Sequence, residues 1–211
     1  SDLVPAEFKQ FVRKNVFGNP AIWVLAIANF FVYIVRYAVL DWGPTLLGEW
    51  KGVSIHHAGW MVAAFEISGI VGMLVAGWAT DRFFGGRGPR VCVICMALAT
   101  VFVALFWGIS QPPMWLATLL LGAAGFCIYG PQALVGIAAA NIATKKAAAT
   151  AVGFTGLFGY ASTLVSGWGL GLLAQHYGWN IAVGALILIA IMGTLIFMAA
   201  WSAKANGYDN D

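Results

Sequence analysis

Two charged residues lie inside stretches of sequence that are otherwise apolar, and they are the residues most able to do chemistry. Arg36 lies well inside the first long apolar stretch, and Glu66 lies near the middle of the second. An arginine in lipid costs at least about 2.5 to 3.5 kcal/mol, so such residues face a protein interior or a water-filled cavity. Because a guanidinium is always charged and its fork matches two phosphate oxygens, Arg36 is predicted to form an anion-binding site. A structural ion pair with Asp41 or Glu66 is the alternative.

Uncharged polar side chains accompany Arg36. Asn29 and Tyr33 lie seven and three residues before it, which places the three side chains on one helical face. An amide, a phenol and a guanidinium in an apolar stretch suit a wall that binds an anion. Tyr129 and Tyr160 lie in the middle of two later apolar stretches, where each hydroxyl either reaches a substrate or belongs to a packed ring. The predicted substrate-binding residues are therefore Arg36, Tyr33, Asn29, Tyr129 and Tyr160.

Two acidic residues, Asp41 and Glu66, follow Arg36 in the sequence. A carboxylate in the middle of a membrane span is by default a functional hypothesis. Glu66 fits three roles: balancing Arg36, carrying a proton, or pairing with a cation on another helix. Asp41 lies five positions after Arg36, about 140° around a helix, so it is a poor direct partner for that guanidinium.

A charged loop is predicted between the second and third apolar stretches. Asp81 is followed directly by Arg82, then by glycines, Arg87 and Arg90. We predict that these charges form a cytoplasmic gate, which pairs with neighbouring helix ends in one conformation and releases them in another. The alternative is that they only orient the chain in the membrane.

The cysteines and histidines do not form a metal or redox pattern. Cys92 and Cys95 form a C-x-x-C inside an apolar stretch, without a second cysteine pair or a nearby histidine to complete a zinc site. The three histidines lie in predicted loops, whereas a haem needs histidines within the spans. No glycine-rich phosphate loop precedes a Lys-Ser or Lys-Thr. We therefore predict no metal, no cofactor and no ATP-driven mechanism.

The elements that must position these residues are membrane helices. Of the 211 residues, 61% are apolar and 9% are charged, whereas a soluble domain is about 25% charged. This composition excludes a disordered or nucleic-acid-binding chain and requires a lipid bilayer as partner. A membrane helix needs about 20 apolar residues. Six stretches have that length: Pro20–Leu47, Ala58–Thr80, Val91–Ile109, Met114–Ala140, Ala147–Ala174 and Trp179–Ser202.

The positive charges predict an orientation. Only Lys51 falls on one side of the predicted membrane, and Arg36 lies inside the first span. The other nine share the opposite side: Lys9, Arg13, Lys14, Arg82, Arg87, Arg90, Lys145, Lys146 and Lys204. Because cytoplasmic loops are enriched in positive residues, both chain ends are predicted to be cytoplasmic, in a multi-pass protein of the cell membrane. The predicted parts are a cytoplasmic lead-in at 1–19, a six-helix bundle at 20–203 and a cytoplasmic tail at 204–211.

Several motifs resemble those of a known family of transporters. Asp81-Arg82 with Gly86, Arg87 and Arg90 is similar to the cytoplasmic loop that recurs in both halves of major facilitator superfamily proteins. The segment Phe31–Tyr37, with Leu40-Asp41-Trp42 and Pro44-Thr45, resembles the seventh helix of the organophosphate:phosphate antiporters. Three later segments resemble the tenth helix, the following loop and the eleventh helix of that family: Tyr129-Gly130-Pro131, Lys145–Ala148 and Gly153–Tyr160.

The resemblance implies a fold and a set of roles. It implies an all-α membrane protein in which this chain is the carboxyl-terminal half, helices seven to twelve of a twelve-helix fold, with an amino-terminal six-helix half as partner. It also implies that Arg36 binds phosphate, that Tyr33 lies beside that site, and that Asp41 and Glu66 take part in ion pairs coupled to substrate binding. Hexose-phosphate members carry charges in the eleventh helix, and this chain has none between Ala147 and Ala174, which disfavours a hexose phosphate.

The expected function is transport without covalent chemistry, so we do not expect an enzyme. The resemblance implies a secondary transporter that exchanges an organic phosphate ester for inorganic phosphate by alternating access. The ester would be glycerol 3-phosphate or a related sugar phosphate or phosphoglycerate. Two alternatives stay open: a membrane sensor of sugar phosphate, and a proton-coupled metabolite exporter in which Glu66 carries the proton.

Overall fold

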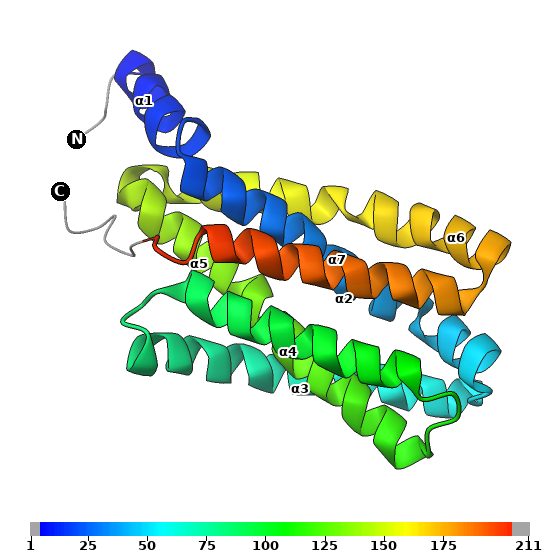
Figure 1. Cartoon of the computed structure of the whole chain (residues 1–211). Helices are drawn as coiled ribbons and strands as arrows, with labels where there is room; N and C mark the ends of the chain where they lie inside the picture. Colours follow the sequence, from blue (N-terminus) through cyan, green and yellow to red (C-terminus); the bar gives the residue numbers. More distant parts are fainter. Residues whose placement is uncertain (1–4, 204–211) are drawn as a thin grey trace.

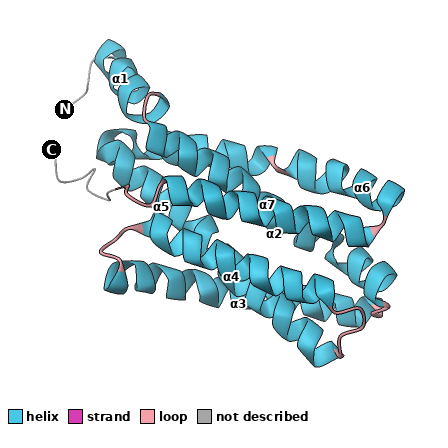
Figure 2. Ribbon diagram, viewed as in Figure 1, coloured by secondary structure: helices cyan, strands magenta, loops and turns pink. Residues whose placement is uncertain are grey.

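The computed structural model describes residues 5–203, and within that range every regular element is a helix (Figures 1 and 2). The predicted all-α fold class is confirmed. Residues 1–4 and the predicted tail 204–211, with Lys204, lie outside the described residues. The elements are α1 (Pro5–Val12), η1 (Arg13–Phe17), α2 (Pro20–Lys51), α3 (Ile55–Phe83), α4 (Gly88–Gly108), α5 (Met114–Ala161), η2 (Leu164–Gly169), α6 (Leu170–Tyr177) and α7 (Trp179–Ala199).

Local sequence signals fix several helix ends. α2 begins at Pro20, whose missing N–H costs nothing in a first turn, and the side chain of Asn19 caps it. The same helix stops at Gly52, which has a φ of 69°, a conformation that favours glycine. Gly85 and Gly86 also have positive φ and make the turn between α3 and α4. These ends lie within a few residues of the predicted boundaries.

The fourth and fifth predicted spans are helices joined with almost no loop between them, and the chain reverses direction there. Within residues 5–203, five stretches are long and apolar enough to cross a membrane, and the longest, Met114–Tyr177, has 64 residues. At ~1.5 Å per residue it would measure roughly 96 Å as a straight helix, far more than a bilayer of about 30 Å. Thr144 interrupts it with a φ of 70° and a ψ of 164°, and the ribbon reverses there (Figure 1). The bundle is therefore crossed six times.

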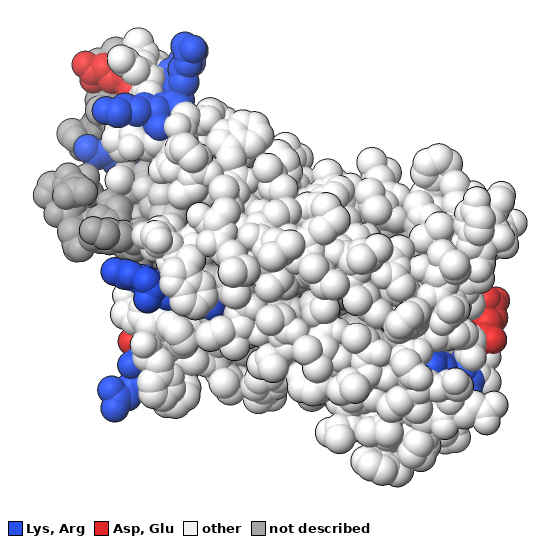
Figure 3. All heavy atoms as spheres, viewed as in Figure 1, with Lys and Arg blue, Asp and Glu red and all other residues white. Residues whose placement is uncertain are grey.

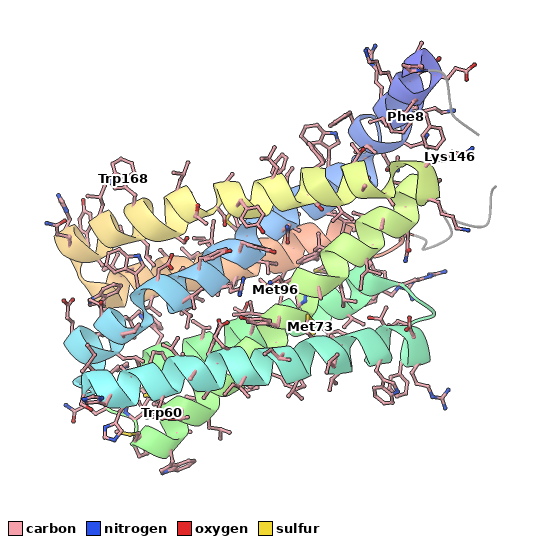
Figure 4. All side chains as sticks on the ribbon, turned by 180° about the vertical axis from the view of Figure 1, so that it is seen from behind. Phe8, Trp60, Met73, Met96, Lys146 and Trp168 are labelled. Carbon is pink, nitrogen blue, oxygen red and sulfur yellow. The ribbon has the colours of Figure 1, made fainter. Side chains whose placement is uncertain are left out.

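α5 is the centre of the packing. α5 contacts α2, α3 and α4, while α7 packs against α2 and α4. The apolar core has two parts, one that includes Phe65 and Met96 and one that includes Leu47 and Met61. Figure 4 shows Met96 and Met73 among the helices, whereas Trp60 and Trp168 project outward. Those two tryptophans are each 75% exposed, as suits side chains that meet lipid headgroups.

Small residues let α3 approach α5 closely. A Cβ at Gly72 would collide with the backbone carbonyl of Phe126, and one at Gly125 would collide with the carbonyl of Phe65. The hydroxyl of Ser68 donates to the carbonyl of Gly122 at 2.8 Å. This backbone-to-backbone packing is typical of membrane helices, which associate through small residues.

Charge is distributed unevenly between the two ends of the bundle. Both described chain ends, the α3–α4 turn and the reversal at Thr144 lie at one end, called here the terminal end (Figure 1). Lys and Arg side chains gather at this end, while the long face that Figure 3 shows is almost free of charge. Lys146 is among them (Figure 4). An apolar belt with charged ends is the surface that a membrane-spanning bundle needs.

Candidate functional site

Three helices bring a cation, an acid and a phenol together inside the bundle. Arg36 comes from α2, Glu66 from α3 and Tyr129 from the first half of α5. The Arg36 Nη2 atom lies 3.7 Å from Glu66 Oε2. The hydroxyl of Tyr129 donates to the same carboxylate oxygen, and its ring lies beside the Arg36 guanidinium. Tyr129 therefore contacts both charges, and the ion pair with Glu66 that the sequence left as an alternative is present.

The sequence of α3 makes room for this arrangement. Gly69 lies one turn after Glu66, and a Cβ there would collide with the ring of Tyr129. The ring can therefore lie against α3 with its hydroxyl directed at the carboxylate. Tyr129 also presents its face to Arg36, whose Cζ atom lies 4.8 Å from the ring centroid. The aromatic face adds a cation–π attraction that helps to hold the guanidinium inside the bundle.

The charged centre has unused hydrogen-bonding capacity. The Arg36 Nε and Glu66 Oε1 atoms are buried, and neither has a hydrogen-bond partner within the described part of the chain. The side chains are 16% and 30% exposed, so the centre is shielded but open to a ligand. A guanidinium has five N–H donors, and Arg36 uses only part of that set here. The centre can bind an anion if the ligand competes with Glu66 for the guanidinium.

Tyrosine rings extend the site from Arg36 toward the second half of α5. The Arg36 Cζ atom lies 5.3 Å from the centroid of the Tyr37 ring, and the Tyr33 and Tyr37 centroids are 5.6 Å apart. Tyr33 in turn lies 6.2 Å from the ring of Tyr160, which is 65% exposed. Four of the predicted substrate-binding residues, Arg36, Tyr33, Tyr129 and Tyr160, thus belong to one connected wall.

Asn29 lies apart from the charged centre. It is 3% exposed, and its amide nitrogen donates to the backbone carbonyl of Thr155 at 2.9 Å. Gly159 leaves the space that Asn29 and Tyr33 occupy between α2 and the second half of α5. The contact joins two helices, and a direct role of Asn29 toward a substrate stays a prediction.

Gln132 is a polar residue of the site that the sequence analysis passed over. It lies three residues after Tyr129 on α5, and its side chain lies beside the phenol of Tyr33. Its Oε1 atom is buried without a hydrogen-bond partner in the described region. The only sequence signal was an amide inside an apolar span, which attracts less attention than a charge.

Asp41, the other predicted acidic residue, and the charged loop from Asp81 to Arg90 lie away from the charged centre. Asp41 and Asp81 are exposed, and neither forms an ion pair within 4.0 Å among residues 5–203. The loop residues Arg82 and Arg87 likewise form none in that range. The Arg90 Nε atom donates to the carbonyl of Trp201 at 3.1 Å, and its Cζ lies 5.2 Å from that ring. This loop arginine therefore connects the start of α4 with Trp201, just after α7.

No three His, Cys, Asp or Glu side chains within residues 5–203 gather closely enough to hold a metal ion. Cys92, Cys95 and Cys127 are free thiols inside the bundle. The chemistry of the site is thus that of a guanidinium, a carboxylate, phenols and an amide.

Comparison with known proteins places the chain in a family. Residues 25–207 match the model of the Major Facilitator Superfamily. The chain belongs to this superfamily. Its six passes are therefore membrane-spanning helices, and the predicted superfamily is confirmed.

Several members of the superfamily with known names are similar to this chain. The probable hexose phosphate transport protein of Chlamydia pneumoniae is 40% identical over 92% of the chain and 43% of its own length. The glycerol-3-phosphate transporter of Haemophilus influenzae is 36% identical over 93% of the chain and 45% of its own length. The hexose-6-phosphate:phosphate antiporter of Escherichia coli is 34% identical over 90% of the chain and 42% of its own length. The membrane sensor protein UhpC of Salmonella typhimurium is also 34% identical.

These relatives match the organophosphate:phosphate antiporter family that the motifs resembled. The chain spans less than half the length of each, as expected for about half of such a transporter. Hexose phosphate transporters are among them. That the uncharged segment between Ala147 and Ala174 disfavours a hexose phosphate stays a prediction.

Proposed function

We propose that the full-length protein to which this chain belongs exchanges an organic phosphate ester for inorganic phosphate across the cell membrane. The observation that carries the proposal is the half-buried Arg36, held by Tyr129 and Glu66, whose buried Nε atom has no hydrogen-bond partner within residues 5–203. A guanidinium grips a phosphoryl group with two parallel hydrogen bonds. The relatives named for glycerol 3-phosphate and hexose 6-phosphate support a phosphate ester as the substrate class.

The geometry suggests how phosphate binding would change the site. An arriving phosphate dianion competes with Glu66 for Arg36, and the displaced carboxylate keeps its hydrogen bond from Tyr129. A second cation, contributed by the amino-terminal half that we infer from the relatives' lengths, then balances the remaining charge. The bound anion attracts cations from both halves, and this attraction closes the two halves around the central site.

Obligate exchange follows from the same electrostatics. Without a phosphate between them, two facing cations repel each other, so the empty site closes poorly. The protein therefore changes its outward or inward orientation only when loaded. We place the terminal end of the bundle in the cytoplasm because its loops carry the positive residues, and we assign the loop Asp81–Arg90 as the gate on that side.

Counterflow of labelled phosphate tests the function directly. Full-length protein in vesicles preloaded with unlabelled phosphate or glycerol 3-phosphate should accumulate labelled phosphate from outside, and empty vesicles should not. Accumulation that follows a pH gradient and ignores the internal phosphate would instead favour a proton-coupled carrier. The same vesicles without protein supply the background.

A sensor is the second candidate function, because one relative is a membrane sensor protein. A sensor would bind the ester at the same centre and pass the signal to a partner, without net exchange. Ester binding by the purified protein, together with counterflow no faster than that of protein-free vesicles, would favour the sensor over the carrier.

A further inference from the structure

We propose that Gln132 and Tyr33 form a subsite that binds a hydroxyl group on the carbon skeleton of the phosphate ester. The inference rests on the proposed function, since it takes the phosphoryl group to lie at Arg36. It adds a specificity-determining pair: Arg36 binds the part that all substrates share, and Gln132 with Tyr33 binds the part that differs between esters and inorganic phosphate.

The pair lies one helical turn from the charged centre. Tyr33 precedes Arg36 by three residues on α2, and Gln132 follows Tyr129 by three residues on α5. α2 runs away from the terminal end, and the first half of α5 runs toward it (Figure 1). Tyr33 and Gln132 therefore both lie about 4.5 Å closer to the terminal end than Arg36 and Tyr129 do. A hydroxyl on the second or third carbon of an ester bound at Arg36 reaches that level.

The hydrogen-bonding groups of the pair match a hydroxyl. The side chain of Gln132 lies beside the phenol of Tyr33, and its Oε1 atom is buried without a partner in the described part of the chain. The phenol O–H is a donor, and Oε1 is an acceptor. A substrate hydroxyl needs one of each. If the amide is turned by 180°, the pair still presents one donor and one acceptor.

A buried carbonyl oxygen without a donor lowers stability, so its persistence needs a reason. A ligand hydroxyl supplies the missing donor. The ring of Tyr160, 6.2 Å from that of Tyr33, borders the pair and offers an apolar face to the C–H groups of a carbon skeleton. A site with unpaired hydrogen-bonding groups discriminates strongly against a ligand that lacks the matching hydroxyl.

The test measures binding to the purified full-length protein and compares four probes: inorganic phosphate, ethyl phosphate, glycerol 3-phosphate and glucose 6-phosphate. Ethyl phosphate has the ester but no hydroxyl. Gln132→Met keeps the length of the side chain and removes its donor and acceptor. We expect the dissociation constants of the two hydroxylated esters to rise roughly fivefold to tenfold relative to that of inorganic phosphate. The ratio of the dissociation constant of ethyl phosphate to that of inorganic phosphate should stay unchanged.

Controls separate a specificity role from a structural one. Tyr33→Phe removes the free donor and should shift the same two esters in the same direction. Gln175→Met replaces an exposed amide near the end of α6 and should leave the dissociation constants of all four probes as in the wild type. If Gln132→Met weakens all four probes by one factor, or changes none, the subsite is refuted.

Exchange is measured separately in vesicles, so the two proposals fail in different ways. If Gln132→Met loses ester binding selectively but the wild type does not exchange phosphate, the subsite is supported and the antiporter function is refuted. If the wild type exchanges phosphate but Gln132→Met leaves the ratios of dissociation constants unchanged, the antiporter function is supported and the subsite is refuted. Failure of the wild type to bind any of the four probes would overturn both.

Discussion

At the scale of single residues, the site depends on the two contacts of the Glu66 carboxylate, one with Arg36 and one with Tyr129. Its Oε2 atom lies 3.7 Å from Arg36 and accepts from Tyr129, so one carboxylate oxygen compensates the guanidinium and orients the phenol. A buried charge that loses its partner is costly. The residue therefore stabilises the empty site, and in the proposed exchange it releases Arg36 when phosphate binds.

Glu66→Gln is predicted to impair exchange without preventing membrane insertion. The amide still accepts from Tyr129, but Arg36 loses its counter-charge, and phosphate leaves a more positive site more slowly. We expect counterflow to fall about tenfold or more, in line with a charge pair worth on the order of 1.5 kcal/mol or more. Glu49→Gln is the matched control, because Glu49 accepts from Trp179 at the other end of the bundle. Normal exchange in Glu66→Gln would make that carboxylate a bystander.

Part of the site was predictable from residue types and part was not. Arg36, Tyr33 and Glu66 were identifiable because charges and phenols are rare inside apolar spans and expensive there. The partnership of Glu66 with Tyr129 depends on how α3 and α5 are rotated about their axes, which the sequence of neither helix determines alone. Gln132 was missed because its importance comes from an unpaired oxygen, a property of the packing rather than of the residue type.

At the scale of elements, the contact between α3 and α5 places two of the three central side chains. Gly72 faces the backbone of Phe126 across this contact, whereas a Cβ at Gly77, further along the same helix, meets nothing within 4 Å. Spacing of small residues suggests close packing, but only the structure distinguishes a glycine in a contact from one beside an open space.

Gly72→Ala is therefore predicted to destabilise the bundle. The added methyl group forces α3 away from α5, and overpacking of this kind costs about 1 to 3 kcal/mol. We expect a lower melting temperature in detergent and weaker ester binding, because Glu66 and Tyr129 separate. Gly77→Ala is the control and should melt at or above the wild-type temperature. Equal melting temperatures for the two variants would show that the close approach is not needed.

The helix boundaries show how far local signals reach. Backbone chemistry explains the cap at Asn19, the break at Gly52 and the glycine turn after Phe83. The reversal between the fourth and fifth spans was predicted as a loop after Ala140, yet helix continues to Thr144 and resumes at once. Alanine-rich sequence favours helix on both sides, so the sequence did not indicate how short the turn is.

At the scale of the whole molecule, the asymmetry of charge predicts an orientation. An impermeant thiol reagent added outside intact cells should label Ser110→Cys, in the loop after α4, and should not label Phe83→Cys at the terminal end. Phe83 is 66% exposed, so a lack of labelling at this position would reflect its side of the membrane rather than burial. The native thiols at Cys92 and Cys127 are buried and should react little. External labelling of Phe83→Cys would contradict the orientation.

The proposed exchange depends on phosphate being gripped by Arg36. The proposed rocking motion and obligate exchange both require a central guanidinium that holds a phosphoryl group between two bundles. Lysine keeps the charge of arginine but lacks its two-pronged fork. The two substitutions Arg36→Lys and Arg36→Ala therefore separate the grip from the charge and from a purely structural ion pair.

The most direct measurement is phosphate affinity, together with melting temperature, for the full-length protein carrying Arg36→Lys or Arg36→Ala. A charge-assisted hydrogen bond contributes about 1.5 to 3 kcal/mol, so we predict that Arg36→Lys weakens phosphate binding roughly tenfold or more. Its melting temperature should stay near that of the wild type, and Arg36→Ala should abolish binding. Unchanged affinity in Arg36→Lys would contradict the bidentate grip, and near-normal binding in Arg36→Ala would contradict the anion site itself.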